Sequence, residues 1–250
     1  MRALTEKRGW AFGLGVVVLK PLLVAISDRT WIDGEKIPPT GGCLVVFNHI
    51  SHLDPLTAAH MVYDHGRVPR FLAKSSLFTN RVLGGFLKSA GQIPVERLSR
   101  NAVGAYDAAV RGVRDGHCVV VYPEGTLTRD PGLWPMTGKT GAARIALETG
   151  CPVIPVGQWG VNELLAPYAK LPDLFPRKDV SMRVGNPVDL DDLRGLPRTA
   201  ENLAEATERI MTAITEQVAI LRDETPPAVR FDARKAGVKL TGNPNKPDKR

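Results

Sequence analysis

CLVVFNHISHLDP, residues 43–55, joins a five-residue apolar run, Cys43 to Phe47, to a polar segment that contains His49 and Asp54. The run follows a Gly-Gly pair and contains two valines, a pattern that predicts a short buried strand. In α/β proteins, reactive side chains gather at the carboxyl ends of parallel strands. The segment therefore predicts a strand that lies in the core and delivers a candidate active site at its end.

The rest of the chain repeats this alternation of short apolar runs and longer helix-compatible segments. Glycines that are typical of helix ends, Gly116 and Gly150, close two of these segments. The predicted strands are Cys118 to Tyr122 and Val153 to Val156, with Val180 to Val184 as a further candidate, and the predicted helices are 101–115, 140–149 and 200–223. This rhythm predicts an α/β fold with a largely parallel sheet flanked by helices.

Three segments differ in composition and give the predicted organisation: an N-terminal segment 1–27, a domain 28–224 and a tail 225–250. The apolar stretch Trp10 to Ile26 would reach only about 25 Å as a helix, whereas a bilayer core is about 30 Å thick. We therefore expect it to lie in a membrane interface; a helix packed on the protein's own core is the alternative. Lys20 and Pro21 interrupt it and argue against a secretory signal. The tail, rich in Pro, Lys and Asn, is expected to be flexible.

Charge is unevenly distributed along the 250 residues. The whole chain carries +7, while segments 1–27, 66–100 and 225–250 carry +3, +6 and +5, so the remainder is acidic. Basic segments imply an anionic partner. Segment 66–100 mixes its basic residues with many apolar ones, and only 6% of the chain is aromatic. We therefore expect a lipid surface, with no nucleic acid as a partner.

His49 is the candidate general base. An imidazole has a pKa of about 6.5 and can accept a proton at neutral pH when a carboxylate fixes its tautomer. Asp54 can supply that carboxylate if the four intervening residues turn. The alternative is that Asp54, or Ser51, only caps the next helix. The chain contains neither a G-x-S-x-G motif for a serine hydrolase nor a CxxC or HExxH motif for a metal, and Cys43, Cys118 and Cys151 are expected to be buried thiols.

Four motifs, in order along residues 43–160, together resemble the glycerolipid acyltransferase family, typified by 1-acylglycerol-3-phosphate acyltransferases. They are Asn48-His49 through Asp54, Gly91 through Arg97, Tyr122-Pro123-Glu124-Gly125-Thr126 and Val153 through Gly157. Four ordered motifs are far more specific than any one of them. A fifth stretch, Phe71 through Lys74, resembles a family segment that carries a phosphate-binding lysine.

The resemblance implies a direct transfer of a fatty acyl group, with His49 and Asp54 as the general base pair and neither a metal nor another cofactor. The donor would be acyl-CoA or acyl-carrier protein. The acceptor would be a glycerol-phosphate, first of all 1-acylglycerol 3-phosphate, which gives phosphatidic acid; glycerol 3-phosphate, a lysophospholipid or a glycolipid are alternatives, and a non-catalytic membrane-binding relative is less favoured. The protein would lie on the cytoplasmic face of the cell membrane as a peripheral or monotopic protein.

The predicted substrate-binding residues are Lys74, Arg97, Glu124, Gly125, Thr126 and Arg129. Arg97 and Lys74 would hold the acceptor phosphate, and Glu124 would bind acceptor hydroxyls or a nearby arginine. In much of the family an arginine follows the Glu-Gly-Thr triplet, but here that position is Leu127. Either Arg129 takes its place or the headgroup is held differently. His52 is expected to be an ordinary surface imidazole.

Overall fold

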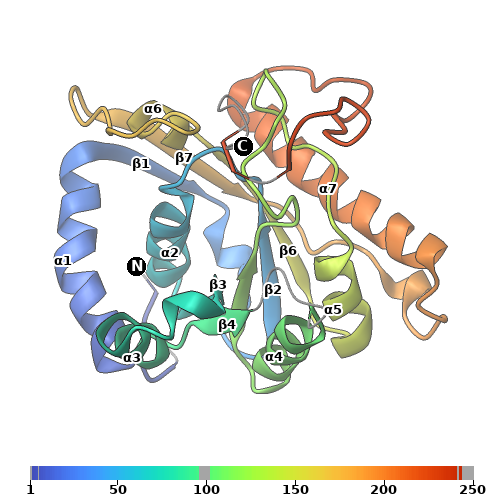
Figure 1. Ribbon diagram of the computed structural model, residues 1–250, viewed down its shortest axis with the longest axis horizontal. Coiled ribbons are helices and arrows are strands. Elements are labelled where there is room, and N and C mark those ends of the chain that lie inside the picture. The colour runs from blue at the N-terminus through green and yellow to red at the C-terminus, as the bar shows by residue number, and fades with distance from the viewer. Residues whose placement is uncertain (1, 5, 96–101, 241, 244–250) are drawn as a thin grey trace, which may run out of the picture.

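The computed structural model describes residues 2–4, 6–95, 102–240 and 242–243, and these form a seven-stranded sheet between two layers of helices (Figure 1). The strand order is β1-β7-β6-β2-β5-β3-β4, and neighbouring strands are parallel except for β6 and β7. The strands are β1 Ser27–Ile32, β2 Cys43–Phe47, β3 Pro69–Lys74, β4 Ile93–Val95, β5 Cys118–Val121, β6 Val153–Trp159 and β7 Lys178–Val184. This arrangement confirms the predicted α/β class with a mostly parallel sheet.

The helices divide between the two faces of the sheet (Figure 1). One layer contains α1 Trp10–Ile26, α2 Asp54–Asp64, α3 Arg81–Ser89 and α6 Val161–Leu164; the other contains α4 Ala102–Arg114, α5 Gly141–Thr149 and α7 Ala200–Arg222. Short 3-10 helices, η1 Gly34–Lys36, η2 Ser75–Leu77 and η3 Asp191–Leu193, lie in the connections. Helix α3 packs against α1 and so extends the first layer beyond the sheet.

Strand β2 is the centre of both cores. Its alternate side chains Cys43, Val45 and Phe47 join the α1 and α2 side, while Leu44 and Val46 join the α4, α5 and α7 side. All five are fully buried. A strand covered on both faces needs apolar residues at every position, which explains the unbroken apolar run that predicts it. The two cores hold this strand, and hence the segment that follows it, in a fixed place.

Most predicted elements lie where the sequence placed them. Strand β2 has the predicted bounds, β5 ends one residue early at Val121, and β6 continues to Trp159. The stretch Trp10 to Ile26 is a single helix, α1, although Pro21 lies within it. Among the described residues, no helix combines the length and hydrophobicity needed to cross a bilayer. Cys43, Cys118 and Cys151 are free thiols and buried, as expected.

A fully buried arginine, Arg67, ties the chain's N-terminal segment to the amino end of the sheet. Its guanidinium forms an ion pair with Glu6 and donates hydrogen bonds to three backbone carbonyls, those of Pro38, Gly41 and Gly116. The backbone amide of Arg2 also donates to the carbonyl of Asp64, at 2.9 Å. The described residues that precede α1 are therefore anchored to the domain.

The described part of the C-terminal tail contacts the domain. The backbone amide of Thr137 donates to the carbonyl of Phe231 at 2.9 Å, and Ala233 is buried. The predicted flexibility of segment 225–250 stays a prediction, as do the segment boundaries at 27 and 224; β1 begins at Ser27 and α7 ends at Arg222.

Candidate active site

His49 and Asp54 are in direct contact at the carboxyl end of β2. The Nδ1 atom of His49 lies 2.7 Å from Oδ2 of Asp54. A carboxylate accepts hydrogen bonds, so Nδ1 carries the proton and Nε2 keeps its lone pair. The His49 side chain is 16% exposed and lines a cavity. This pair has the geometry of an imidazole base that a buried carboxylate orients.

The same carboxylate oxygen also organises the turn between the two residues. Oδ2 of Asp54 accepts hydrogen bonds from the backbone amides of Ile50, at 2.7 Å, and Ser51, at 2.9 Å. These donors lie upstream of α2, and α2 has no side-chain cap at its N-terminus. Burial raises the pKa of Asp54, while His49 and the two amides oppose that rise. Asp54 therefore braces the turn that presents His49 and does not serve as a simple helix cap.

Two neighbours restrict how His49 can move. Its ring stacks on Tyr122, with centroids 4.3 Å apart and an angle of 26° between the planes. Asn48, just before it, is bound to Gln158 of β6 by three hydrogen bonds of 2.6 to 3.0 Å. Burial raises the pKa of Tyr122, so its ring remains a neutral wall. The end of β2, the Tyr122 ring and the hydrogen bonds between Asn48 and Gln158 together hold the imidazole in one orientation.

Glu124 supports His49 from behind. Its carboxyl group accepts hydrogen bonds from the backbone amides of His49, at 2.8 Å, and Met136, at 3.1 Å. The side chain is buried, and burial raises its pKa to about 8. Glu124 does not line the cavity. Its observed contacts make it a positioning residue for His49, and its predicted binding to substrate stays a prediction.

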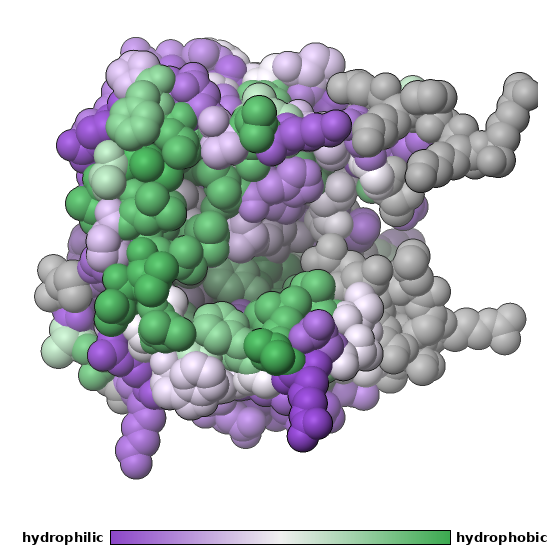
Figure 2. Space-filling model, turned by 60° about the vertical axis from the view of Figure 1, so that its left-hand side comes forward, coloured by the Kyte–Doolittle hydropathy of each residue, from purple (hydrophilic) through white to green (hydrophobic). Residues whose placement is uncertain are grey.

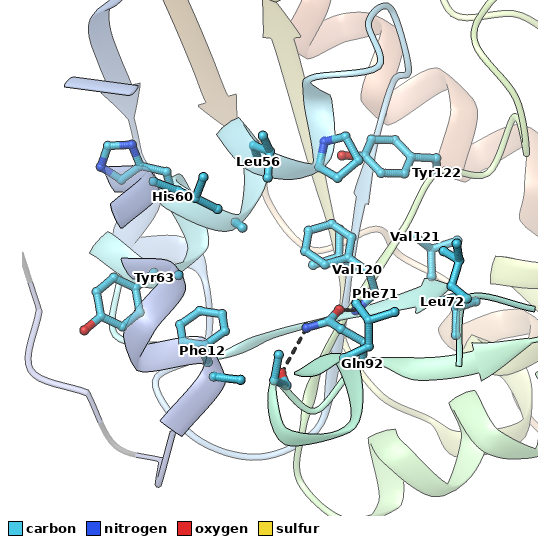
Figure 3. A pocket seen from close by; sticks show the side chains of 18 of the residues that line it. Phe12, Leu56, His60, Tyr63, Phe71, Leu72, Gln92, Val120, Val121 and Tyr122 are labelled. Carbon is cyan, nitrogen blue, oxygen red and sulfur yellow. Dashed lines mark hydrogen bonds between the residues drawn. The ribbon is translucent and has the colours of Figure 1, made fainter. Parts of the chain in front are cut away.

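A cavity of about 790 Å³ extends from His49 between the sheet and helices α1, α2 and α3. Figure 3 shows the rings of Phe12, Tyr63 and Phe71 and the side chain of Leu56 around the same open space. Further apolar residues complete the wall: Val16, Leu19 and Leu23 from α1, Leu77 from η2, and Phe86 and Leu87 from α3. A cavity with such a lining fits an alkyl chain, with its reactive end at His49.

The predicted phosphate ligands have different positions in the structure. Arg97 and the side chain of Lys74 fall outside the described residues, so their predicted roles stay predictions. Arg129 is 8% exposed; its guanidinium lies 4.8 Å from the ring centre of Tyr168 and donates to the carbonyl of Gly242 at 2.9 Å. Arg129 does not line the cavity beside His49.

The remaining predicted residues, Gly125 and Thr126, do line the cavity, so the structure brings them together with His49. Gly125 has a φ of +69°, a conformation that favours glycine. Leu127 is buried. Two further features of the site were not predicted from the sequence: Lys139, which lines the same cavity, and the stacking role of Tyr122. Lys139 lies 14 residues after Gly125, and no local pattern links the two.

Comparison with known proteins gives the family. A family model described as Acyltransferase matches residues 29–159. The chain is 32% identical over 140 residues to the chloroplastic 1-acyl-sn-glycerol-3-phosphate acyltransferase BAT2 of Brassica napus. The aligned region is 55% of this chain and 39% of the Brassica protein. It is 25% identical over 198 residues to the 1-acyl-sn-glycerol-3-phosphate acyltransferase of Bacillus subtilis. Here the aligned region is 79% of this chain and 92% of the bacterial protein.

The fold also has a counterpart among solved structures. The crystal structure of the 1-acyl-sn-glycerophosphate acyltransferase PlsC from Thermotoga maritima matches with a TM-score of 0.62 and 22% identity, over 86% of this chain and 81% of that one. This match supports the fold, and the family model covers more than half of the chain, including His49, Asp54 and Glu124. The chain therefore belongs to the glycerolipid acyltransferase family, as its four motifs indicated.

Proposed function

We propose that this protein transfers a fatty acyl group from acyl-CoA or acyl-carrier protein to the free hydroxyl of 1-acylglycerol 3-phosphate, which gives phosphatidic acid. The observation that carries the proposal is the His49 imidazole, oriented by Asp54 and placed at the end of an apolar cavity of about 790 Å³. The names of the relatives support the same class of reaction.

The geometry supports a direct transfer in which His49 acts twice. Nε2 of His49 removes the proton from the acceptor hydroxyl as its oxygen attacks the thioester carbonyl. The resulting tetrahedral intermediate collapses, the C–S bond breaks, and the imidazolium returns the proton to the leaving thiolate. Asp54 stabilises the imidazolium between these two steps, because its carboxylate is hydrogen-bonded to Nδ1. No acyl-enzyme forms, and the protein ends the cycle unchanged.

We also propose that Lys74 and Arg97 bind the acceptor phosphate. Arg129 is a weaker candidate, because it does not line the cavity beside His49. Glycerol 3-phosphate, a lysophospholipid or a glycolipid remain alternative acceptors.

The test is an assay of the full chain with a labelled acyl donor and each of these acceptors. A labelled product with 1-acylglycerol 3-phosphate that exceeds the other products supports the proposal. A larger product with another acceptor reassigns the substrate. A protein that binds vesicles and labels no acceptor would instead be a non-catalytic membrane-binding relative.

The lipid substrate is proposed to enter from the cytoplasmic face of the membrane, by way of α1. On the face that α1 and α3 form, apolar side chains gather around a hollow (Figure 2). The exposed ones include Trp10, Val17, Val18 and Leu22 of α1 and Val82 of α3. Exposed apolar surface of this kind is typical of an interface with lipid.

Exposed basic residues accompany this apolar face. Arg81 and Lys88 of α3 are exposed, and each would add about 1 kcal/mol of attraction to an anionic leaflet. Helix α1 contributes Phe12, Val16 and Leu19 to the cavity, so one helix carries both the apolar exposed face and part of the cavity wall. An acyl chain could therefore pass from lipid to cavity with little exposure to water, at a saving of about 0.8 kcal/mol per CH₂ group.

Vesicle binding tests this membrane contact. The double variant Val17→Asp and Leu22→Asp should sediment with anionic vesicles at least about tenfold more weakly, because each side chain would lose about 1.5–3 kcal/mol of burial. High salt should weaken the remaining binding. Ile220→Asp is the matched control, since Ile220 is 56% exposed but lies on α7, in the other layer. Equal binding by the double variant and the wild type would reject α1 as the membrane contact.

A further inference from the structure

Arg222, the last residue of α7, has a largely buried guanidinium that contacts two tryptophan rings. Its side chain is 9% exposed, and its Cζ atom lies 4.1 Å from the ring centre of Trp134 and 4.2 Å from that of Trp159. It also donates a hydrogen bond to the backbone carbonyl of Gly132 at 2.7 Å and forms an ion pair with Glu224 at 2.5 Å. A planar guanidinium stacks on aromatic faces while its N–H groups donate, so these contacts hold each other in place. Arg222 does not line the active-site cavity, so any part that it has in catalysis is indirect.

The first tryptophan belongs to a loop that holds the backbone of His49. This support loop, residues 128–136, begins with Thr128, whose backbone amide donates to the carbonyl of His49 at 2.7 Å. It ends with Met136, whose amide donates to the carboxyl group of Glu124 at 3.1 Å. The same carboxyl group accepts a hydrogen bond from the backbone amide of His49, at 2.8 Å. The support loop is therefore bonded to both polar groups of the His49 backbone, to one directly and to the other through Glu124.

The support loop is tied together internally at the point where Arg222 contacts it. The hydroxyl of Thr128 donates to the carbonyl of Trp134 at 2.7 Å. The carboxylate of Asp130 accepts hydrogen bonds from the amides of Gly132, at 2.8 Å, and Trp134, at 3.3 Å. A displacement of Gly132 and Trp134 would therefore be transmitted to Thr128, and so to the residue that Thr128 holds.

The second tryptophan belongs to the other structure that holds the catalytic residue. Trp159 is the last residue of β6 and adjoins Gln158, which is joined to Asn48 by three hydrogen bonds of 2.6 to 3.0 Å. Asn48 in turn precedes His49. Arg222 thus contacts both supports of His49, the loop that bonds to its backbone and the strand that bonds to its neighbour.

We propose that Arg222 is a positioning residue for His49. By joining the support loop to the end of β6, it keeps the imidazole in the orientation that proton transfer requires. This inference rests on the proposed acyltransferase function. A displacement of a catalytic group by about 1 Å can cost about 10²-fold in rate, so a contact outside the cavity can still control kcat. The alternative is that Arg222 only stabilises the C-terminal end of α7, where a cation interacts favourably with the helix dipole.

Steady-state kinetics of the full chain separate these two roles. Arg222→Met should lower kcat by about 10- to 100-fold. The KM for either substrate should change less than about twofold, because Arg222 does not line the cavity. Arg222→Lys keeps a charge at the end of α7 but lacks the planar fork that stacks on the rings and donates to Gly132. It should therefore stay folded in urea titrations and still lose most of the same kcat.

Arg230→Met is the matched control for these variants. The side chain of Arg230 is 14% exposed and also pairs with a glutamate, but its contacts are with Glu208 and Thr212 of α7. Its loss should leave kcat within about twofold of the wild type, because neither support of His49 is touched.

A proton NMR signal tests the same proposal without turnover. The proton on Nδ1 of His49 is donated to Asp54 and should give a downfield signal that is absent from His49→Ala. Arg222→Met should broaden or remove this signal under conditions in which the wild type and Arg230→Met keep it. An unchanged signal and kcat in folded Arg222→Met, a wild-type kcat in Arg222→Lys, or equal losses in Arg230→Met would each overturn the proposal. If the wild type labels no acceptor, the proposed function fails, while the His49 signal still tests Arg222.

Discussion

The replacement of Asp54 by asparagine separates catalysis from folding more sharply than any other change at this site. Oδ2 of Asp54 accepts three hydrogen bonds, from His49, Ile50 and Ser51, while Oδ1 is buried and has no partner among the described residues. An asparagine can place its carbonyl oxygen where Oδ2 lies and keep all three bonds. Its NH₂ group then replaces Oδ1 without an acceptor. We expect a loss of about 1–3 kcal/mol in the free energy of unfolding.

The catalytic loss should be much larger than this structural loss. A neutral amide no longer stabilises the imidazolium that forms when His49 takes the acceptor proton. We expect kcat to fall by about 10²- to 10⁴-fold, the range for a lost acid–base contribution. The assay is the initial rate of lipid product formation from labelled acyl-CoA, with urea unfolding of the same preparations.

Two histidine variants provide the comparison. His49→Ala should lose at least as much activity as Asp54→Asn, and its folded state should persist. His52→Ala is the matched control, because His52 is exposed and contacts Tyr168 edge-on outside the His49–Asp54 pair. Near wild-type kcat in folded Asp54→Asn protein, together with reduced stability, would show that Asp54 only braces the turn and would refute the assignment.

Three further changes test the surroundings of the site. Burial raises the pKa of Glu124 to about 8, so the folded protein keeps a proton that an unfolded chain releases near pH 4.3; stability should fall as the pH rises from about 4 to 8, and Glu124→Gln should flatten that fall in urea unfolding. Gly125→Ala should cost about 1–2 kcal/mol in the free energy of unfolding, because its φ is +69° and its Cβ would meet the Lys139 side chain. Arg67→Met should cost about 3–5 kcal/mol, measured by thermal unfolding against the exposed control Arg234→Met, since it removes one partner of an ion pair and three carbonyl contacts.

The sequence could predict the centre of this fold because β2, β5 and β6 are covered on both faces. Such strands carry apolar residues at nearly every position, and the pattern is visible without any knowledge of their neighbours. Strands β1, β3 and β4 escaped prediction for the opposite reason. They lie toward the two ends of the sheet, and β1 and β3 carry charged residues such as Asp28, Arg29 and Arg70. Only pairing with their neighbours identifies them.

The residues of the candidate site also fall into those that the sequence could predict and those that it could not. His49 and Asp54 are five residues apart, so the turn that joins them is a local property and their contact could be predicted. The contacts of Glu124 could not, because they depend on where the loop containing Met136 returns to the sheet. Lys139 depends on that same loop. Arg129 lies two positions beyond Leu127, where much of the family has an arginine, and its contacts with Tyr168 and Gly242 become visible only in three dimensions.

The attachment of α1 at both ends has a consequence for how the protein would sit on a membrane. Before the helix, Glu6 is held by Arg67; after it, β1 pairs with β7, and Arg177 donates to the carbonyl of Ser27 at 2.9 Å. A helix joined to the domain by a flexible linker would bind a lipid surface without fixing the orientation of the domain. Because α1 is attached at both ends, its orientation relative to the sheet is fixed, and a membrane that orients the helix also orients the sheet. The depth and tilt of the His49 imidazole relative to the headgroups would then be set by the fold itself, so that each encounter with a bilayer is also an alignment of the catalyst with its substrate.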